Sequence, residues 1–247
     1  LDKTGTLTSG AVELDHIESC LGGGTAAGKV SDGSVAFGSG ADDAAGGSAG
    51  TDAVASADDA ARAALAYLVG GSEANATAGA IATGLTGLEP AQARYAIAFN
   101  SARKWSAVQT QAGAYVLGAP EIVLAGSADS GSTGSGSTDD AALERVKALA
   151  GMGKRVLVLA HSNQSLDQSE NPTLPKDLTA ALLVVLAEQV RPDAAQTLDY
   201  FKRQGVAVRV ISGDNPVTVA AIAAHLGLRN PDGGEPVGVD ARTLPAI

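Results

Sequence analysis

The pattern of apolar and polar positions predicts that the chain has two parts of different architecture. Between about residues 11 and 189, short apolar runs alternate with polar and glycine-rich connections, which is typical of an α+β arrangement. After residue 190, a helix, a fully apolar strand and another helix follow one another, which is the element order of a parallel α/β sheet. We therefore expect an α+β domain over residues 11–189, inserted into an α/β domain formed by residues 1–10 and 190–247.

Within the first part, the pattern predicts strands, helices and two long loops. Strands are expected at 11–19, 93–99, 104–110, 114–119, 154–162 and 178–188. Helices are expected at 59–71, 75–85 and 140–153, the first of them capped by Asp58 or Asp59. The segments 38–59 and 126–141 consist mainly of small and polar residues, so we expect both to be loops.

Within the second part, the pattern predicts one strand between two helices. The first helix covers 191–205, with Pro192 in its first turn and Gly205 at its end. The apolar run 206–212 is expected to be a buried strand, and residues 213–228 a loop that leads into the second helix.

Composition narrows the classes of protein that this chain can belong to. At 247 residues it can form one large domain or two small ones, and its net charge of −10 argues against a nucleic-acid binder. A single cysteine, Cys20, excludes an internal disulfide and disfavours a thiolate zinc site. The longest apolar stretch, which starts at Leu178, is too short to span a bilayer, and no signal peptide is visible. We expect a monomer that does not insert into a membrane by itself.

Two stretches carry candidate phosphate chemistry, "DKTGTLT" at the start of the chain and "VISGDNPVT" after the predicted strand 206–212. If they meet at the carboxyl edge of a parallel sheet, Asp2 and Asp214 would repel each other unless a divalent cation or a cationic group lies nearby. The hydroxyls of Thr4 and Ser212 and the backbone around Gly213 can hold phosphoryl oxygens. This set predicts Mg²⁺-dependent phosphoryl transfer with Asp2 as nucleophile. For "SGDN" taken alone, a capped turn between strand and helix is the simpler explanation.

A second candidate site surrounds Phe99, one of only three phenylalanines. An aromatic face beside Arg103 and Lys104 suits a stacked base with a phosphate tail. The alternative is that Phe99 is a core residue and the two cations a solvated edge, and the residues alone slightly favour this alternative. Trp105 follows Lys104 and points to the opposite side by strand alternation, so we expect it to pack in the core. The three histidines show no metal-ligand spacing.

The motifs together resemble the P-type ATPases, membrane pumps of the haloacid-dehalogenase-like superfamily. "DKTGTLT" matches their phosphorylation signature, and "FNSARKWSAV", "LGAPE" and "GKRVLVLA" are similar to stretches of their nucleotide-binding domain, in the same order. "RPDAAQTLDYFKRQGVAVRVISGDNPVTVAAIAAHLGL" is similar to the segment that re-enters the phosphorylation domain. The resemblance implies a haloacid-dehalogenase-like phosphorylation domain with a parallel sheet, incomplete here, and an inserted α+β nucleotide-binding domain with an antiparallel sheet.

The resemblance also implies roles for individual residues. Asp2 would accept the γ-phosphoryl group of ATP, with Asp2 and Thr4 as Mg²⁺ ligands. The remaining catalytic residues would be Lys3, Thr6, Ser212, Gly213 and Asp214. The nucleotide would be bound by Asn75, Thr77, Phe99, Lys104, Gly118 and Arg155, although Asn75 and Thr77 could equally be helix caps.

The chain departs from the family pattern at several positions. Leu117 stands where many relatives carry a lysine, so one cation of the adenine site is missing and we expect weak nucleotide affinity. Ala78 and Gly79 stand where the family carries an acidic residue. Thr4 replaces the second aspartate of the superfamily's phosphatases, which removes their general acid–base. The strand before the phosphorylated aspartate and the carboxylates of a "DGVND"-type motif are not in the sequence. We therefore expect the fragment alone to have little or no ATPase activity.

The sequence thus predicts the ATP-binding and aspartyl-phosphorylation region of a membrane cation-transporting P-type ATPase. In the intact pump, hinges near Gly10 and Arg191 would bring ATP onto Asp2. Its partners would be ATP and the transmembrane and actuator domains of the same chain, at the cytoplasmic face of a bacterial plasma membrane. The alternatives are a soluble haloacid-dehalogenase-type phosphatase, or a nucleotide-binding regulatory module without catalysis.

Overall fold

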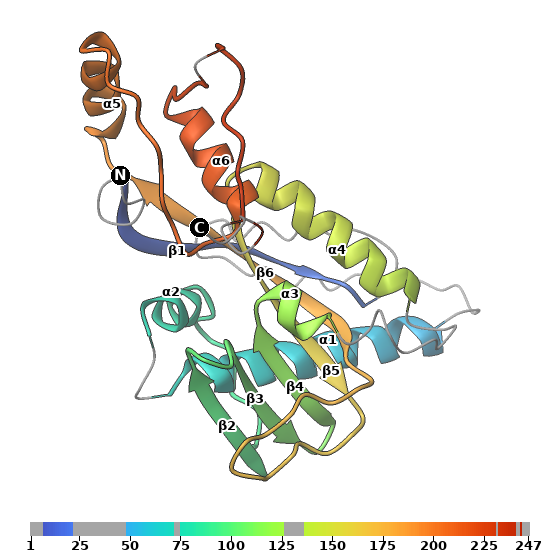
Figure 1. Cartoon of the computed structure of the whole chain (residues 1–247). Helices are drawn as coiled ribbons and strands as arrows, with labels where there is room; N and C mark the ends of the chain where they lie inside the picture. Colours follow the sequence, from blue (N-terminus) through green and yellow to red (C-terminus); the bar gives the residue numbers. More distant parts are fainter. Residues whose placement is uncertain are drawn as a thin grey trace, which may run out of the picture.

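An antiparallel sheet forms the centre of the computed structural model, which describes residues 7–21, 48–71, 75–125, 136–230, 232–240 and 243. The six strands lie in the order β1-β6-β5-β4-β3-β2 (Figure 1). Every strand predicted for the first part is confirmed. The strands are β1 (Thr8–Ser19), β2 (Tyr95–Asn100), β3 (Trp105–Thr110), β4 (Gly113–Gly118), β5 (Arg155–Ser162) and β6 (Thr179–Val190).

Helices cover both faces of this sheet. One face carries α1 (Ser48–Val69) and α2 (Ala76–Gly84), and the other carries α3 (Pro120–Val123) and α4 (Gly136–Gly151). The continuous apolar run of β6 follows from this arrangement: Leu183 and Val185 belong to the core under α4, while Leu182 and Val184 belong to the core under α1. A strand that is buried on both faces needs no polar alternation.

Two of the predicted loops are partly wrong, because helices start inside them. α1 begins at Ser48, and Asp58 lies within it, where its carboxylate pairs with the Arg62 Nε at 2.6 Å instead of capping the helix. α4 likewise begins at Gly136. Glycine and serine content pointed to loops, but in α1 the alanines between these residues have the highest helix propensity of all residues and favour the helix.

The C-terminal part contains α5 (Ala194–Arg203) and α6 (Pro216–His225), which confirms both helices predicted there. With Leu7, they form a small separate core through Leu198, Ile222 and Leu226. The strand predicted over 206–212 is wrong for the described chain: only Ile211 makes a bridge, and 74% of this residue is exposed. A strand requires hydrogen-bonded neighbours along its length, and a single bridge at Ile211 does not supply them, so the described residues do not form the expected parallel sheet.

Two connections join the C-terminal part to the sheet. The first is the ribbon of β1 and β6, which is irregular between the pairs Thr8–Val190 and Val12–Glu188, where Gly10 has a φ of 76°. The second is the contact of α6 with the end of α4 (Figure 1) and with the turn that follows it. There the Thr218 hydroxyl donates to the Lys154 carbonyl at 3.3 Å. In the described ranges, we find no helix that is both long and apolar enough to cross a bilayer.

Candidate functional site

A cleft of about 840 Å³ opens where one end of the sheet faces the loop before α6. Its walls come from the end of α1, the start of α2, the β2–β3 turn, the β4–α3 junction, the start of β5 and residues 213–218. All six residues predicted to bind nucleotide line it, as do two of the predicted catalytic residues. These eight are Asn75, Thr77, Phe99, Lys104, Gly118, Arg155, Gly213 and Asp214.

Phe99 is an exposed residue of the cleft wall. It lies near the end of the edge strand β2, and 52% of it is accessible to solvent. An exposed ring on a strand edge is available for stacking, so Phe99 is not the core residue of the alternative interpretation. Trp105 is buried, with 4% exposed, in the core on the α3 and α4 face, as predicted.

Lys104 reaches the cleft from a tight turn between β2 and β3. Its φ is 62°, the only positive φ among the described non-glycine residues. A side chain in this left-handed region costs roughly 1–2 kcal/mol, so surrounding contacts have to hold it. The Lys104 amide donates to the Asn100 carbonyl at 2.6 Å, and the Ala102 amide donates to the Asn100 side chain at 2.8 Å.

Gly118 is explained by packing beneath this turn. A Cβ at this position would lie 2.9 Å from the Trp105 Cβ and from the Val123 Cγ2, and 3.0 Å from the Lys104 carbonyl oxygen. No larger residue fits without moving the backbone. Gly118 therefore lets the end of β4 pass directly under the turn that carries Lys104.

Arg155 opens β5 and lines the cleft next to Lys154, which the sequence analysis missed. The Lys154 ammonium lies 3.1 Å from an Asp15 carboxylate oxygen. Partial burial acts to raise the pKa of Asp15, but hydrogen bonds from Lys154 and His16 outweigh it and keep that pKa below its ordinary value.

Acidic groups share the cleft with the cations. The carboxylates of Glu121, Glu188 and Asp214 line its described walls, together with Lys104, Lys154 and Arg155. The described walls therefore carry both signs of charge, and the cations are those that a phosphate group would contact.

The loop before α6 forms the wall opposite the sheet. The Asp214 amide donates to the Ser212 hydroxyl, and this hydroxyl donates to the Asp214 carboxylate, both at 3.2 Å. Asn215 caps α6 by accepting from the Val217 amide at 2.9 Å, and Pro216 occupies the first turn. The capped turn expected for "SGDN" is thus present, and it places Gly213 and Asp214 on the cleft.

Asn75 also acts as a cap. Its side-chain oxygen accepts from the Ala78 amide at 2.9 Å at the start of α2, so the helix-cap interpretation of this residue is correct. Thr77 follows in the first turn, on the cleft wall. Capping uses the oxygen of Asn75, and the position of this residue on the cleft wall is compatible with a ligand contact through its amide nitrogen.

The remaining catalytic residues of the sequence analysis, Asp2, Lys3, Thr4 and Thr6, lie outside the described residues. Their neighbours Leu7 and Thr8 are buried at the start of β1. In the part of the chain that the structure describes, no three acidic, histidine or cysteine side chains are grouped as a metal site. The pairing of Asp2 with Asp214 around a metal ion therefore stays a prediction.

The structure thus presents an antiparallel sheet covered by helices, a small C-terminal core around α5 and α6, and a ligand-sized cleft between the end of the sheet and the loop before α6. A family model described as haloacid dehalogenase-like hydrolase matches residues 1–235, so the chain belongs to that family. The calcium-transporting ATPase CtpE of Mycolicibacterium smegmatis is 42% identical over 150 residues, a match that covers 60% of this chain and 16% of that protein. The probable cation-transporting ATPase exp7 of Streptococcus pneumoniae is 38% identical over 130 residues, covering 52% of this chain and 15% of that protein.

These relatives confirm the resemblance to the P-type cation-transporting ATPases. The chain spans only 16% of the length of the first relative, which is therefore far larger than the sequence described here. Among solved structures, the crystal structure of a zinc-transporting PIB-type ATPase aligns with 92% of this chain and 27% of its own, with 20% identity and a TM-score of 0.45.

Proposed function

We propose that this chain is the ATP-binding and phosphorylation region of a membrane cation-transporting P-type ATPase. The observation that carries the proposal is the convergence of all six predicted nucleotide residues with Gly213 and Asp214 on one cleft. They come from segments up to about 140 residues apart in sequence, from Asn75 to Asp214. The names of the relatives, calcium-transporting and probable cation-transporting ATPases, favour the same assignment.

The residues along the cleft favour one orientation of a bound nucleoside triphosphate. The adenine stacks on the exposed ring of Phe99, in the part of the cleft formed by β2, the end of α1 and apolar residues such as Leu117. Lys104 and Arg155 neutralise the phosphates, and the γ-phosphoryl group points towards Gly213 and Asp214. The volume of about 840 Å³ lies within the range of small-molecule sites.

The chemistry proposed for the intact protein is transfer of the γ-phosphoryl group to Asp2. A carboxylate oxygen of Asp2 attacks the γ-phosphorus, the bond to the β–γ bridging oxygen breaks, and ADP leaves. Lys3, Thr4 and Thr6 would support the phosphoryl group from the same turn, and Ser212, Gly213 and Asp214 from the opposite one. Asp2 and Thr4 are the residues of this chain that would hold Mg²⁺, which supplies charge neutralisation when bound.

Calorimetric titration with AMP-PNP tests the nucleotide assignment. We expect binding by the unmodified chain and a loss of about tenfold in affinity for Phe99→Ala, since base stacking contributes roughly 1–3 kcal/mol. Tyr200→Ala is the matched control, because Tyr200 is an aromatic residue of similar exposure, 54%, on α5 outside the cleft. Equal affinities of the unmodified chain and Phe99→Ala would contradict the assignment.

The setting of the site is part of the proposal. The nucleotide would be ATP from the cytoplasm, and the partners would be the transmembrane and actuator domains of the same pump at the cytoplasmic face of the cell membrane. Incorporation of ³²P from [γ-³²P]ATP into the membrane-bound full-length pump, lost in the variant Asp2→Asn, tests the phosphorylation step.

A further inference from the structure

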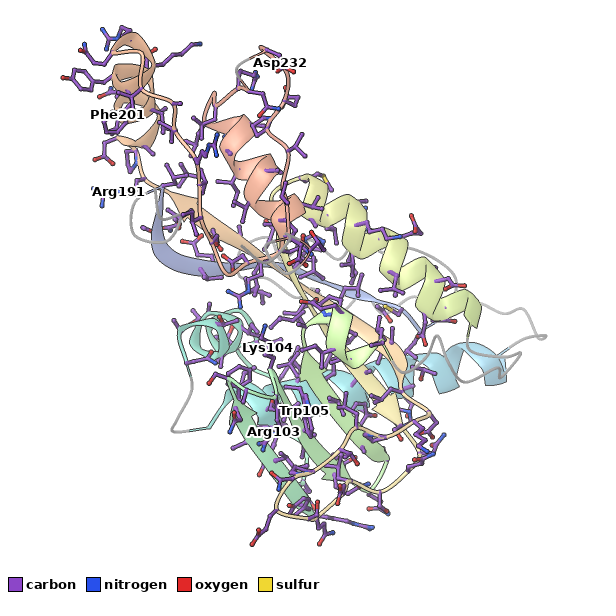
Figure 2. The ribbon with its side chains drawn as sticks, viewed as in Figure 1. Arg103, Lys104, Trp105, Arg191, Phe201 and Asp232 are labelled. Carbon is purple, nitrogen blue, oxygen red and sulfur yellow. The ribbon has the colours of Figure 1, made fainter. Side chains whose placement is uncertain are left out.

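Arg103, which the sequence analysis placed beside a phosphate tail, lies on the turn that carries Lys104 into the cleft but is not among the residues that line the cleft. A terminal nitrogen of its guanidinium donates to the Ala98 carbonyl of β2 at 3.0 Å. The guanidinium carbon lies 5.4 Å from the centre of the Trp105 indole, within the range of a cation–π contact. Figure 2 shows the three consecutive side chains of Arg103, Lys104 and Trp105 around this turn.

Arg103 thus joins the two ends of the turn. Ala98 directly precedes Phe99 on β2, and Trp105 directly follows Lys104 on β3. The register between the strands shifts between the pairs Ile97–Ala107 and Asn100–Trp105, so strand pairing alone does not fix the end of β2. Phe99 lies inside this irregular stretch.

Two contacts hold the Arg103 guanidinium in place even though one of its donors is unpaired. Its Nε is buried and has no hydrogen-bond partner. A buried donor without a partner is unfavourable, and the guanidinium is stabilised in this position by its contacts with the indole and with Ala98. The adjacent Lys104 has a φ of 62°, which also requires support from its surroundings.

We propose that Arg103 is a positioning residue of the nucleotide site. By fixing the end of β2 to Trp105, it sets the direction of the Phe99 ring and keeps Lys104 in its left-handed conformation facing the cleft. It does so without touching the ligand. This inference rests on the proposed nucleotide site and adds to it a supporting arginine that the ligand does not contact.

A competing role for Arg103 is direct binding of phosphate. Comparing the affinity for adenosine, which has no phosphate, with that for AMP-PNP distinguishes the two roles. Loss of a positioning residue disturbs Phe99, so it weakens adenosine as well as AMP-PNP. Loss of a phosphate ligand weakens AMP-PNP and leaves adenosine unchanged.

The experiment measures affinity for AMP-PNP and for adenosine in Arg103→Ala, Arg103→Lys and a control, Arg94→Ala. Arg94 is an exposed arginine just before the other end of β2. We expect Arg103→Ala to weaken both ligands about tenfold, Arg103→Lys to recover part of the loss, and Arg94→Ala to bind as the unmodified chain does. Because the chain has one tryptophan, the fluorescence of Trp105 should change in Arg103→Ala and not in Arg94→Ala.

A double-mutant cycle completes the test. If Arg103 acts through Phe99 and Lys104, adding Arg103→Ala to the variant Phe99→Ala/Lys104→Ala costs no further affinity for AMP-PNP. Unchanged affinity in Arg103→Ala, a loss confined to AMP-PNP, or an additive loss in the cycle would each overturn the positioning role while leaving the nucleotide site intact. Absence of binding by the unmodified chain would overturn the proposed function and this inference with it.

Discussion

Single residues outside the cleft hold β1 to α4 through an ionic network. The Arg145 guanidinium contacts both carboxylate oxygens of Glu18, at 2.6 and 2.9 Å, and His16 lies 2.8 Å from the same carboxylate. Hydrogen bonding from Arg145 keeps the pKa of Glu18 below its ordinary value of 4.5. Because Glu18 is buried, this bidentate pair contributes more than a surface ion pair does.

The pH dependence of stability follows from this pair. A carboxylate with a lowered pKa in the folded state stabilises the fold above its unfolded pKa, and the contribution is lost as the pH falls below about 4.5. We expect Glu18→Gln to reduce the free energy of unfolding at pH 7 by about 1–2 kcal/mol and to flatten its decline below pH 4.5 in urea titrations. The control is Glu144→Gln, which removes an exposed pair with Lys147 and should change little. An equal effect of both variants contradicts this account.

Cys20 provides a second prediction at the scale of a residue. Burial, and after it the nearby carboxylates, raise the pKa of its thiol from 9.0 to about 11. We expect the folded chain to react with iodoacetamide at pH 8 much more slowly than the same chain in denaturant. Mass spectrometry reads the result directly, because Cys20 is the single cysteine of the chain. Rapid labelling of Cys20 in the folded chain at pH 8 would contradict the raised thiol pKa.

At the scale of an element, the end of β4 is shaped by a close approach of backbone. Gly118→Ala places a methyl group within 3.0 Å of Trp105, Val123 and the Lys104 carbonyl. We expect this variant to lose about 1–3 kcal/mol of unfolding free energy, and to bind nucleotide more weakly because the turn above it moves. Gly79→Ala is the matched control: a Cβ there meets nothing within 4 Å.

The same variants separate packing from backbone propensity. Gly79 lies inside α2, where alanine is the better helix former, so Gly79→Ala should stabilise by about 0.5–1 kcal/mol. Thermal unfolding of both variants gives the comparison. If Gly118→Ala proved as stable as the unmodified chain, the close approach under the Lys104 turn would be refuted.

The elements also show what the sequence could and could not predict. Strands β1 to β6 follow from their own alternation or apolar runs, and α2 from its cap at Asn75. The start of α1 at Ser48 was missed because it lies in a low-complexity stretch of small and polar residues, which favours a loop. The short helix α3 was missed because its one signal is Pro120 in the first turn. Residues 206–212 read as a strand because apolar content is local, whereas a strand depends on partners elsewhere.

The residues of the candidate site were likewise predicted only in part from the sequence. The motifs predicted Phe99, Lys104 and Arg155 as one site because the resemblance carries them in order, and the structure brings them to one cleft. The residues alone could not exclude a core position for Phe99, since exposure depends on which face α1 and α2 cover. Lys154 was missed even though it directly precedes Arg155, because its ion pair with Asp15 is formed by tertiary structure.

At the scale of the whole molecule, the sheet and the small core around α5 and α6 both border the cleft, and the β1–β6 ribbon runs between them. The register is irregular around Gly10, which has a φ of 76°, and this is where the sequence analysis places a hinge; the hinge itself stays a prediction. The second contact, between Thr218 of α6 and the Lys154 carbonyl, lies beside Arg155. A ligand that contacts Arg155 and the loop before α6 would therefore lie beside this second contact.

A titration of the ¹⁵N-labelled chain with AMP-PNP, followed by NMR, tests the central claim most directly. The account predicts that the largest chemical-shift changes cluster on Phe99, Lys104, Gly118, Arg155 and Gly213, from both sides of the cleft. The loop between β5 and β6, which contains Asp167 and does not line the cleft, should remain unchanged and serves as the internal control. Shift changes that are absent, or that cluster away from this cleft, would contradict the account.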